Sequence, residues 1–176
     1  STKMNAHCIL CRAPTPTSHE DYVKQLHPWV KKKKAWAQSL MGDMYMKGEG
    51  VKQSYEIASR LYELAAEQGA ACAMCNLGFM YEHGEGVEQS YERAIEYYEQ
   101  AAQLGDANAQ YNLGHMYYNG DGVEQSYERA IEYYEQAAQL EHAEAQYNLG
   151  CIYYNGDGVE RDSTKVKEWW TKAAAN

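Results

Sequence analysis

The chain has no long apolar stretch and almost no phenylalanine. A membrane-spanning helix needs about 18 or more consecutive apolar residues, and no run of that length occurs. The N-terminal segment STKMNAHCIL also lacks the apolar core of a secretory signal peptide. Tyrosine is the main bulky packing residue, with 17 Tyr against one Phe. These absences exclude a membrane-inserted protein and give no indication of secretion.

Basic residues are scarce beyond the first 34 positions. Residues 1–34 carry seven Lys or Arg and two Asp or Glu, whereas residues 35–176 carry nine basic and 23 acidic residues. The larger part therefore has a formal charge of −14 within a total of −9. Nucleic-acid phosphates need clustered Lys and Arg, so this acidic body argues against a nucleic-acid partner. The tetralysine at 31–34 is interpreted as a solvated segment.

Cysteines are few, and their number is odd. The five are Cys8, Cys11, Cys72, Cys75 and Cys151, without a pattern that recurs along the sequence. A disulfide framework would favour an even number at regular spacing. We therefore expect free thiols or metal ligands, and a reducing intracellular compartment such as the cytoplasm.

One segment is repeated letter for letter. GVEQSYERAIEYYEQAAQL occupies residues 86–104 and again 122–140, an offset of 36 residues. A fixed period of about 20–50 residues is typical of stacked repeats, in which each unit packs only on its neighbours. The four copies span residues 35–70, 71–106, 107–142 and 143–176.

Each copy is predicted to form two antiparallel helices, helix A and helix B. In the third copy helix A reads ANAQYNLGHMYYN, with Leu113 and Met116 at helical spacing. Gly120 stands where helix A must end, because glycine adopts positive φ without a Cβ clash. Gly122 allows a second sharp turn, and Val123 is expected to pack between the two helices.

Helix B of the third copy is expected to begin after Ser126. A serine side chain accepts hydrogen bonds from the first free amides of a helix, and Ser54, Ser90 and Asp162 hold the same position in the other copies. Gly114 is predicted to allow close approach of the two helices, despite its low helix propensity. The glutamates of helix B are interpreted as the solvated convex face.

The segment before the repeats divides at Ser18. Residues 1–18 are read as an extended tail, because Pro14 and Pro16 favour extended backbone. Residues 19–34 are read as a capping helix that covers the first repeat and a basic linker. Ser18 is its expected N-cap. Pro28 is expected to end or kink this helix near His27.

The repeat pattern resembles that of the Sel1-like repeat, a relative of the tetratricopeptide repeat. It reads A-x-A-x-Y-x-L-G-x-M-Y-x-x-G-x-G-V, then a Ser or Asp helix cap, then A-x-x-Y-Y/W-x-x-A-A, over residues 35–176. The resemblance implies an all-α fold, an α/α superhelix (solenoid) of four helix-turn-helix repeats after the N-terminal helical cap. It also implies that helix A lines the concave side of an adaptor for protein complexes. The last copy departs from the pattern, with Trp169, Trp170 and Val166 at helix B positions.

A second resemblance lies near the start of the sequence. Cys8-Ile9-Leu10-Cys11-Arg12-Ala13-Pro14 resembles the closing C-P-x-C-R-x-P of a RING finger, with Ile9 in place of proline. A RING needs more Cys and His ligands than precede this motif, so none folds from these residues alone. Cys8 and Cys11 are therefore candidate zinc ligands within a longer parent protein, and no cofactor is expected for the chain itself. The start at Ser1 fits a fragment, a tag remnant or a processed precursor.

The second CxxC motif, Cys72 to Cys75, lies at the start of a helix A. Cys75 takes the place of Tyr111 and Tyr147 in later copies, so cysteine is interpreted here as a small apolar filler. Some secreted Sel1-like proteins carry a disulfide joining the helices of each repeat. Because none of the B helices in this sequence has a cysteine, that branch and its hydrolase associations are disfavoured.

A stripe on helix A remains after its buried positions are removed. One member of the stripe varies most between copies, as Asp43, Phe79, His115 and Cys151, while the scaffold around it is nearly copied, as expected of a recognition surface. The alternative interpretation is a set of unconstrained exposed positions. This contact stripe comprises Trp36, Leu40, Asp43, Lys47, Cys72, Asn76, Phe79, His83, Asn108, Asn112, His115, Asn119, Glu144, Asn148, Cys151 and Asn155.

The leading hypothesis is a non-enzymatic scaffold that binds a peptide or protein partner on the concave helix A surface. The alternative is the substrate-recruiting C-terminal part of a RING-type ubiquitin ligase, which further Cys and His ligands upstream of Ser1 would support. A hydrolase is disfavoured because no nucleophile joins His83, His115 or His142 in a nucleophile–base set. The last repeat has no polar capping helix after it, which indicates self-association through an exposed end or a truncation.

Overall fold

The computed structural model describes residues 16–175, so the predictions for Cys8 and Cys11 lie outside the described residues. Within this part the secondary structure is entirely helical. None of these helices is both long and apolar enough to cross a membrane. The helices are α1 (His19–Lys31), α2 (Ala35–Lys47), α3 (Tyr55–Ala66), α4 (Ala71–His83), α5 (Tyr91–Gln103), α6 (Ala107–Asn119), α7 (Tyr127–Gln139), α8 (Ala143–Asn155) and α9 (Ser163–Ala175).

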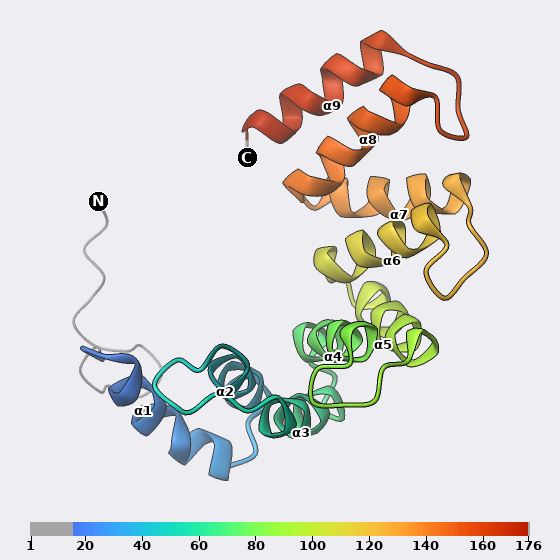
Figure 1. Ribbon diagram of the computed structural model, residues 1–176. Helices are drawn as coiled ribbons and strands as arrows, with labels where there is room; N and C mark the ends of the chain where they lie inside the picture. Colours follow the sequence, from blue (N-terminus) through green and yellow to red (C-terminus); the bar gives the residue numbers. More distant parts are fainter. Residues whose placement is uncertain (1–15, 176) are drawn as a thin grey trace.

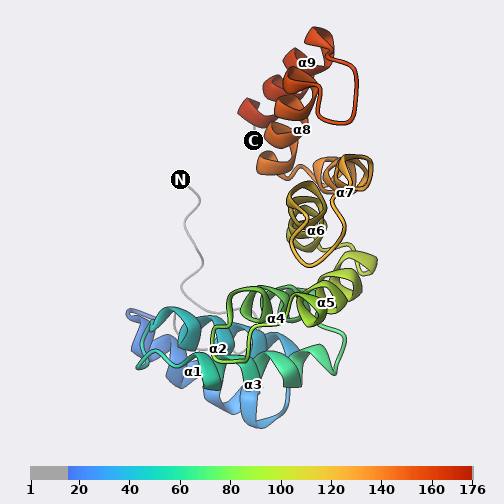
Figure 2. The ribbon, with the colours of Figure 1, turned by 45° about the vertical axis from the view of Figure 1, so that its right-hand side comes forward.

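The helices form an arch of hairpins, as the predicted solenoid requires. Figure 1 shows α2, α4, α6 and α8 on the inner side of the arch, and α3, α5, α7 and α9 on the outer side. Figure 2 shows the same succession of stacked pairs from a second direction. Helices pack mainly on their neighbours in sequence, and α4 also contacts α6 across one repeat. The even-numbered helices are the predicted A helices, and they line the concave face.

Apolar packing is distributed along the arch instead of gathering at one centre. In one cluster, Ala58 and Tyr62 of α3 pack with Leu77 and Met80 of α4, and all four side chains are fully buried. Similar clusters follow in the later repeats. Each repeat therefore completes its core with the inner helix of the next repeat, as solenoids do.

The glycine and serine predictions for the repeat loops are confirmed. Gly120 and Gly122 have φ of 82° and 71°. The Ser126 hydroxyl accepts a hydrogen bond from the first turn of α7, as Ser54 and Ser90 do for α3 and α5. Asp162 accepts from two amides of α9 in the same way. Short local signals thus determine where each hairpin turns.

Gly114 lies where α6 meets α7, as predicted. A Cβ at this position would lie 2.7 Å from Tyr134 Cδ1, which is closer than side chains approach one another. Gly42 and Gly78 face Tyr62 and Tyr98 in the same way. The mid-helix glycine therefore leaves room for the large aromatic ring of the paired helix.

Tyrosines and arginines form a stack that recurs between the two helices of a hairpin. The Arg93 guanidinium lies 4.3 Å from the centre of the Tyr81 ring, and Tyr81 stacks on Tyr97 with ring centres 5.6 Å apart. One repeat later Arg129 lies 4.1 Å from the centre of Tyr117. These cation–π contacts help to explain why α5 and α7 both carry arginine and paired tyrosines.

The acidic residues of the outer helices face solvent, as predicted. Glu92 and Glu96 are exposed, and so are Glu128 and Glu132 one repeat later. They lie on α5 and α7, away from the concave side (Figure 1). Like charges four residues apart on a helix repel weakly, which an exposed face tolerates.

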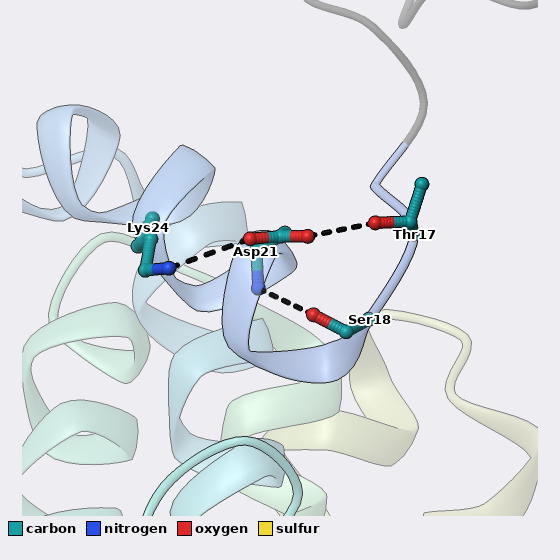
Figure 3. Close-up of polar contacts among 4 residues, drawn as sticks. All are labelled: Thr17, Ser18, Asp21 and Lys24. Atoms are coloured by element: carbon teal, nitrogen blue, oxygen red, sulfur yellow. Dashed lines mark hydrogen bonds and ion pairs between the residues drawn. The ribbon is translucent and has the colours of Figure 1, made fainter.

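Helix α1 begins at the predicted cap. Figure 3 shows the Asp21 backbone amide donating to Ser18 Oγ at 3.1 Å, and Thr17 Oγ1 donating to Asp21 Oδ2 at 2.8 Å. Lys24 Nζ lies 3.4 Å from Asp21 Oδ1. Hydrogen bonds from Thr17, Ser18 and Lys24 lower the pKa of Asp21. Side chains that precede the helix and one within it thus stabilise the first turn of α1.

The prediction that Pro28 ends α1 near His27 is wrong, and the alternative of a kink there stays a prediction. The helix runs through Pro28 to Lys31. Trp29 and Val30, which follow the proline, pack on the apolar cluster that joins α1 to α2. Tertiary packing at these two residues offsets the backbone hydrogen bond that proline cannot donate.

Candidate functional site

The contact stripe lies on the inner helices, and none of its residues is buried. Its first-repeat members differ from the rest in their surroundings. Trp36 lies against Trp29 of α1 with ring centres 5.8 Å apart, and Leu40 packs on the α1–α2 cluster. Asp43 accepts a hydrogen bond from the buried Tyr62 hydroxyl at 2.6 Å. The first repeat therefore uses several of its stripe positions for internal packing.

Most stripe residues of the later repeats line two cavities on α4, α6 and α8. The larger cavity, the groove, has a volume of about 530 Å³. It is lined by the stripe residues Cys72, Asn76, Phe79, Asn108, Asn112 and Glu144, together with Met46, Cys75, Asp106, Tyr111 and His142. The smaller cavity, the Tyr134 pocket, has a volume of about 270 Å³. It is lined by the stripe residues His115, Asn119, Asn148 and Cys151, together with Tyr111, Tyr118, Tyr134 and Ile152.

The structure leaves six stripe residues outside both cavities. They are Trp36, Leu40, Asp43, Lys47, His83 and Asn155. That any stripe residue contacts a partner stays a prediction.

Tyr111 joins the two cavities, because its ring lines both. His142 stacks on it with ring centres 4.8 Å apart and planes 16° apart. His142 Nδ1 accepts from the Ala145 amide at 3.3 Å and so caps α8. Its Nε2 then carries the proton and donates to Asn108 Oδ1 at 3.2 Å. The His142 imidazole therefore caps α8, stacks on the Tyr111 ring and holds the Asn108 side chain in the groove.

Sequence reasoning did not place Asp106, Tyr111, Tyr118 or His142 at this surface. Asp106 and His142 are equivalent in the repeat, and both cap an inner helix. The rule that identified Ser126 as a cap also applies to Asp106, so that signal was available. Tyr111 and Tyr118 gave no comparable signal, since tyrosine is common at buried and exposed positions of every repeat.

Amide side chains link successive inner helices across the concave face. Asn76 Nδ2 of α4 donates to Asp43 Oδ1 of α2 at 3.1 Å. Asn112 Nδ2 of α6 lies 4.0 Å from Cys75 Sγ of α4. The asparagines therefore lie at the seams between repeats, one repeat apart, with part of their hydrogen-bonding capacity unused.

The charge of the groove is acidic. Asp106 and Glu144 line it, whereas no Lys or Arg lines either cavity. Glu144 is exposed, and its Oε2 lies 3.4 Å from His142 Nδ1. A binding segment with basic side chains suits this surface better than an acidic one.

The three cysteines of the described part are free thiols. Cys75 is buried in an apolar cluster, which confirms the filler interpretation for this residue. Burial, with a smaller contribution from the Asp106 carboxylate, raises the pKa of the Cys75 thiol. Cys72 is exposed on the groove wall, where the contact stripe has it, so the filler interpretation holds for Cys75 alone. In residues 16–175, no three His, Cys, Asp or Glu side chains gather closely enough to hold a metal ion.

The repeat geometry agrees with a comparison against protein-family models. The Sel1 repeat model matches residues 37–69, 73–106, 107–142 and 143–176. The chain belongs to the Sel1 repeat family. A comparison with curated proteins finds no match.

Solved Sel1 repeat structures share the arch. A Sel1 repeat protein from Oxalobacter formigenes is 33% identical, with a TM-score of 0.80 over 89% of this chain and 62% of that chain. The protective antigen c5321 of uropathogenic Escherichia coli, which displays an SLR fold, is 26% identical with a TM-score of 0.79, over 90% of this chain and 34% of that chain. Helicobacter pylori cysteine rich protein B shares the fold alone, at 22% identity and a TM-score of 0.60, over 73% of this chain and 96% of that chain. This Sel1 repeat protein thus spans less than two thirds of the length of the first two.

Proposed function

We propose that this Sel1 repeat protein is a non-enzymatic scaffold that binds an extended segment of a protein partner along α4, α6 and α8. The observation that carries the proposal is the pair of adjoining cavities on the concave face. Their volumes of about 530 and 270 Å³ suit several side chains of a peptide. Their walls include the stripe position that varies most between otherwise copied repeats, where Phe79, His115 and Cys151 stand.

The asparagines supply recognition of a peptide backbone. Asn76, Asn112 and Asn148 recur at the 36-residue interval on three successive inner helices. A carboxamide both donates and accepts, as the peptide groups of an extended segment require.

The variable side chains supply the selection among partners. Phe79 is 37% exposed, on the groove wall, and its ring stacks on His83 with centres 4.2 Å apart. His115 lies on the wall of the second cavity. An exposed aromatic face beside amides is typical of a peptide-binding surface. Asp106 and Glu144 favour basic side chains in the groove.

The proposal is tested with a display library of random peptides selected on the wild-type protein. Selected peptides are expected to lose most of their affinity for the double variant Phe79→Ala, His115→Ala. They are expected to bind the double variant Glu96→Ala, Glu132→Ala as they bind the wild type, because both glutamates lie on the outer helices. Circular dichroism checks that both variants fold. Equal binding to the Phe79→Ala, His115→Ala variant and the wild type would exclude the concave face as the binding surface.

A further inference from the structure

The buried tyrosine of each outer helix donates its hydroxyl proton to a carboxylate in the first two repeats. Tyr62 donates to Asp43 Oδ1 at 2.6 Å, and Tyr98 donates to Glu82 Oε2 at 2.8 Å. The amide of Asn76, on α4 of the second repeat, also donates to Asp43 Oδ1, at 3.1 Å. One phenol and one carboxamide thus hold the same carboxylate oxygen. A buried phenol needs such an acceptor, since losing it costs free energy.

The third repeat departs from this arrangement. Tyr134 corresponds to Tyr62 and Tyr98 and is 1% exposed. His115 stands at the position of Asp43, and Tyr118 stands at the position of Glu82. Tyr118 donates its own hydroxyl proton to Asp157 Oδ2 at 2.7 Å. No carboxylate in residues 16–175 accepts from the Tyr134 hydroxyl.

The Tyr134 pocket is lined by His115 and Tyr118, the residues at the positions of these two carboxylates. Its wall includes Tyr134, His115 and Asn148, and Asn148 stands at the position that Asn76 holds two repeats earlier. His115 lies beside Asn119, whose Nδ2 is 3.2 Å from His115 Nε2. The two donors that hold Asp43 in the first repeat therefore recur on the wall of a cavity of about 270 Å³. Burial raises the pKa of Tyr134, so its hydroxyl remains protonated at neutral pH.

We propose that the Tyr134 pocket binds a carboxylate of the partner, held by the Tyr134 hydroxyl and the Asn148 amide as Tyr62 and Asn76 hold Asp43. The inference rests on the proposed function and names the chemistry of one binding position. An Asp or Glu side chain and the C-terminus of a peptide present the same group. The groove, lined by Asp106 and Glu144, accommodates a different part of the same segment.

Two carboxylates near the pocket repel a bound anion, which makes the affinity depend on salt concentration. Asp157 accepts from Tyr118, and Asp121 accepts from Asn119 Nδ2 at 3.2 Å, so both lie beside pocket residues. They repel a bound anion, and added salt screens that repulsion. Binding of a carboxylate to this pocket is therefore expected to strengthen with salt, opposite to the behaviour of a salt bridge.

The test uses three small probes and the backbone amide resonance of Asn148. N-acetylglutamate N-methylamide presents the carboxylate of a side chain, N-acetylglycylglycine presents a C-terminal carboxylate, and N-acetylglutamine N-methylamide is the neutral analogue of the first. At least one acid is expected to give a saturable shift, with the glutamine probe weaker by about tenfold, because hydrogen bonds to charged groups are the stronger ones. Whichever acid binds identifies the source of the carboxylate. Equal binding of the glutamate and glutamine probes, or no saturable shift with either acid, overturns the proposal.

Two variants of the third repeat test the donors, and a variant of the second repeat is the matched control. His115→Asp places a carboxylate at the repeat position that Asp43 holds in the first repeat. The new carboxylate is expected to accept from Tyr134 and Asn148 and so to abolish the saturable shift. Tyr134→Phe keeps the ring and removes one donor, and it is expected to weaken binding by about tenfold. Tyr98→Phe removes the equivalent hydroxyl from the second repeat and is expected to leave the titration unchanged.

The outcomes separate this inference from the proposed function. If Tyr134→Phe does not fold, the His115→Asp titration still decides, because wild-type affinity in that variant contradicts the proposal. Display-selected peptides that depend on Phe79 but carry no free carboxylate would sustain the proposed function and remove this inference.

Discussion

Gly114 shows how one residue sets the distance between an inner and an outer helix. Its Cα lies against the Tyr134 ring, and a Cβ there would lie 2.7 Å from Tyr134 Cδ1. Both Gly114 and Tyr134 are almost completely buried. Neither residue can yield without moving α6 or α7, since protein interiors are close-packed.

Gly114→Val is therefore expected to destabilise the protein by about 1–3 kcal/mol, the usual cost of overpacking a core. Thermal unfolding followed by circular dichroism measures the effect. His115→Val is the matched control, because it adds the same β-branched residue to an exposed position of the same helix. An unchanged melting temperature for Gly114→Val would show that this glycine is not a packing position.

At the scale of one element, α1 shows tertiary packing overriding local preference. Pro28 removes one backbone donor from the helix, yet Trp29 and Val30 beyond it are held on the α1–α2 cluster. Pro28 itself is exposed. The proline therefore weakens the helix and makes no buried contact in exchange.

Pro28→Ala is expected to raise the free energy of unfolding by about 1–3 kcal/mol, because it restores a helical amide and removes an unfavourable helix residue. Urea denaturation monitored by circular dichroism checks the change. A lower stability in the variant would mean that the proline ring makes a contact that α1 requires.

The elements also show which parts of the fold were open to prediction from sequence. Helix starts and ends depend on residues within one turn, so Ser126 and Gly120 were enough to place the α6–α7 hairpin. The path of α1 past Pro28 depends on contacts with α2, which local rules do not contain. The Tyr134 pocket arises from substitutions at two positions on α6 and from the approach of α8. Its existence therefore required the three-dimensional pairing of three helices.

At the scale of the whole molecule, protonated tyrosines link helices along the arch. Tyr62 and Tyr98 join the two helices of one repeat, and Tyr118 joins the third repeat to the fourth. Burial, then the Asp43 carboxylate, raises the pKa of Tyr62, and burial followed by Glu82 raises that of Tyr98. A hydrogen bond to Asp157 is the largest cause that raises the pKa of Tyr118 to about 12. Each phenol thus binds its proton more tightly in the folded protein than in the unfolded state.

The raised pKa values of these phenols predict that the protein unfolds at alkaline pH. Their contribution to stability is fully present below the unfolded tyrosine pKa of about 10, and it is lost as pH rises through the raised folded values. For Tyr118 that window extends from about 10 to about 12. The last part of the tyrosinate absorbance, from these phenols, is expected to appear together with the loss of helical circular dichroism. Tyrosine ionisation that is complete well before helicity is lost would show that these phenols do not stabilise the arch.

Partner binding on the concave face is tested most directly by mapping amide chemical shifts on adding a display-selected peptide. The shifts are expected to concentrate in α4, α6 and α8, with the largest near Phe79, Asn112 and Asn148. The outer helices α5 and α7 are expected to change little, although they belong to the same hairpins. Shifts concentrated on α5 and α7, with α4, α6 and α8 unaffected, would contradict binding on the concave face.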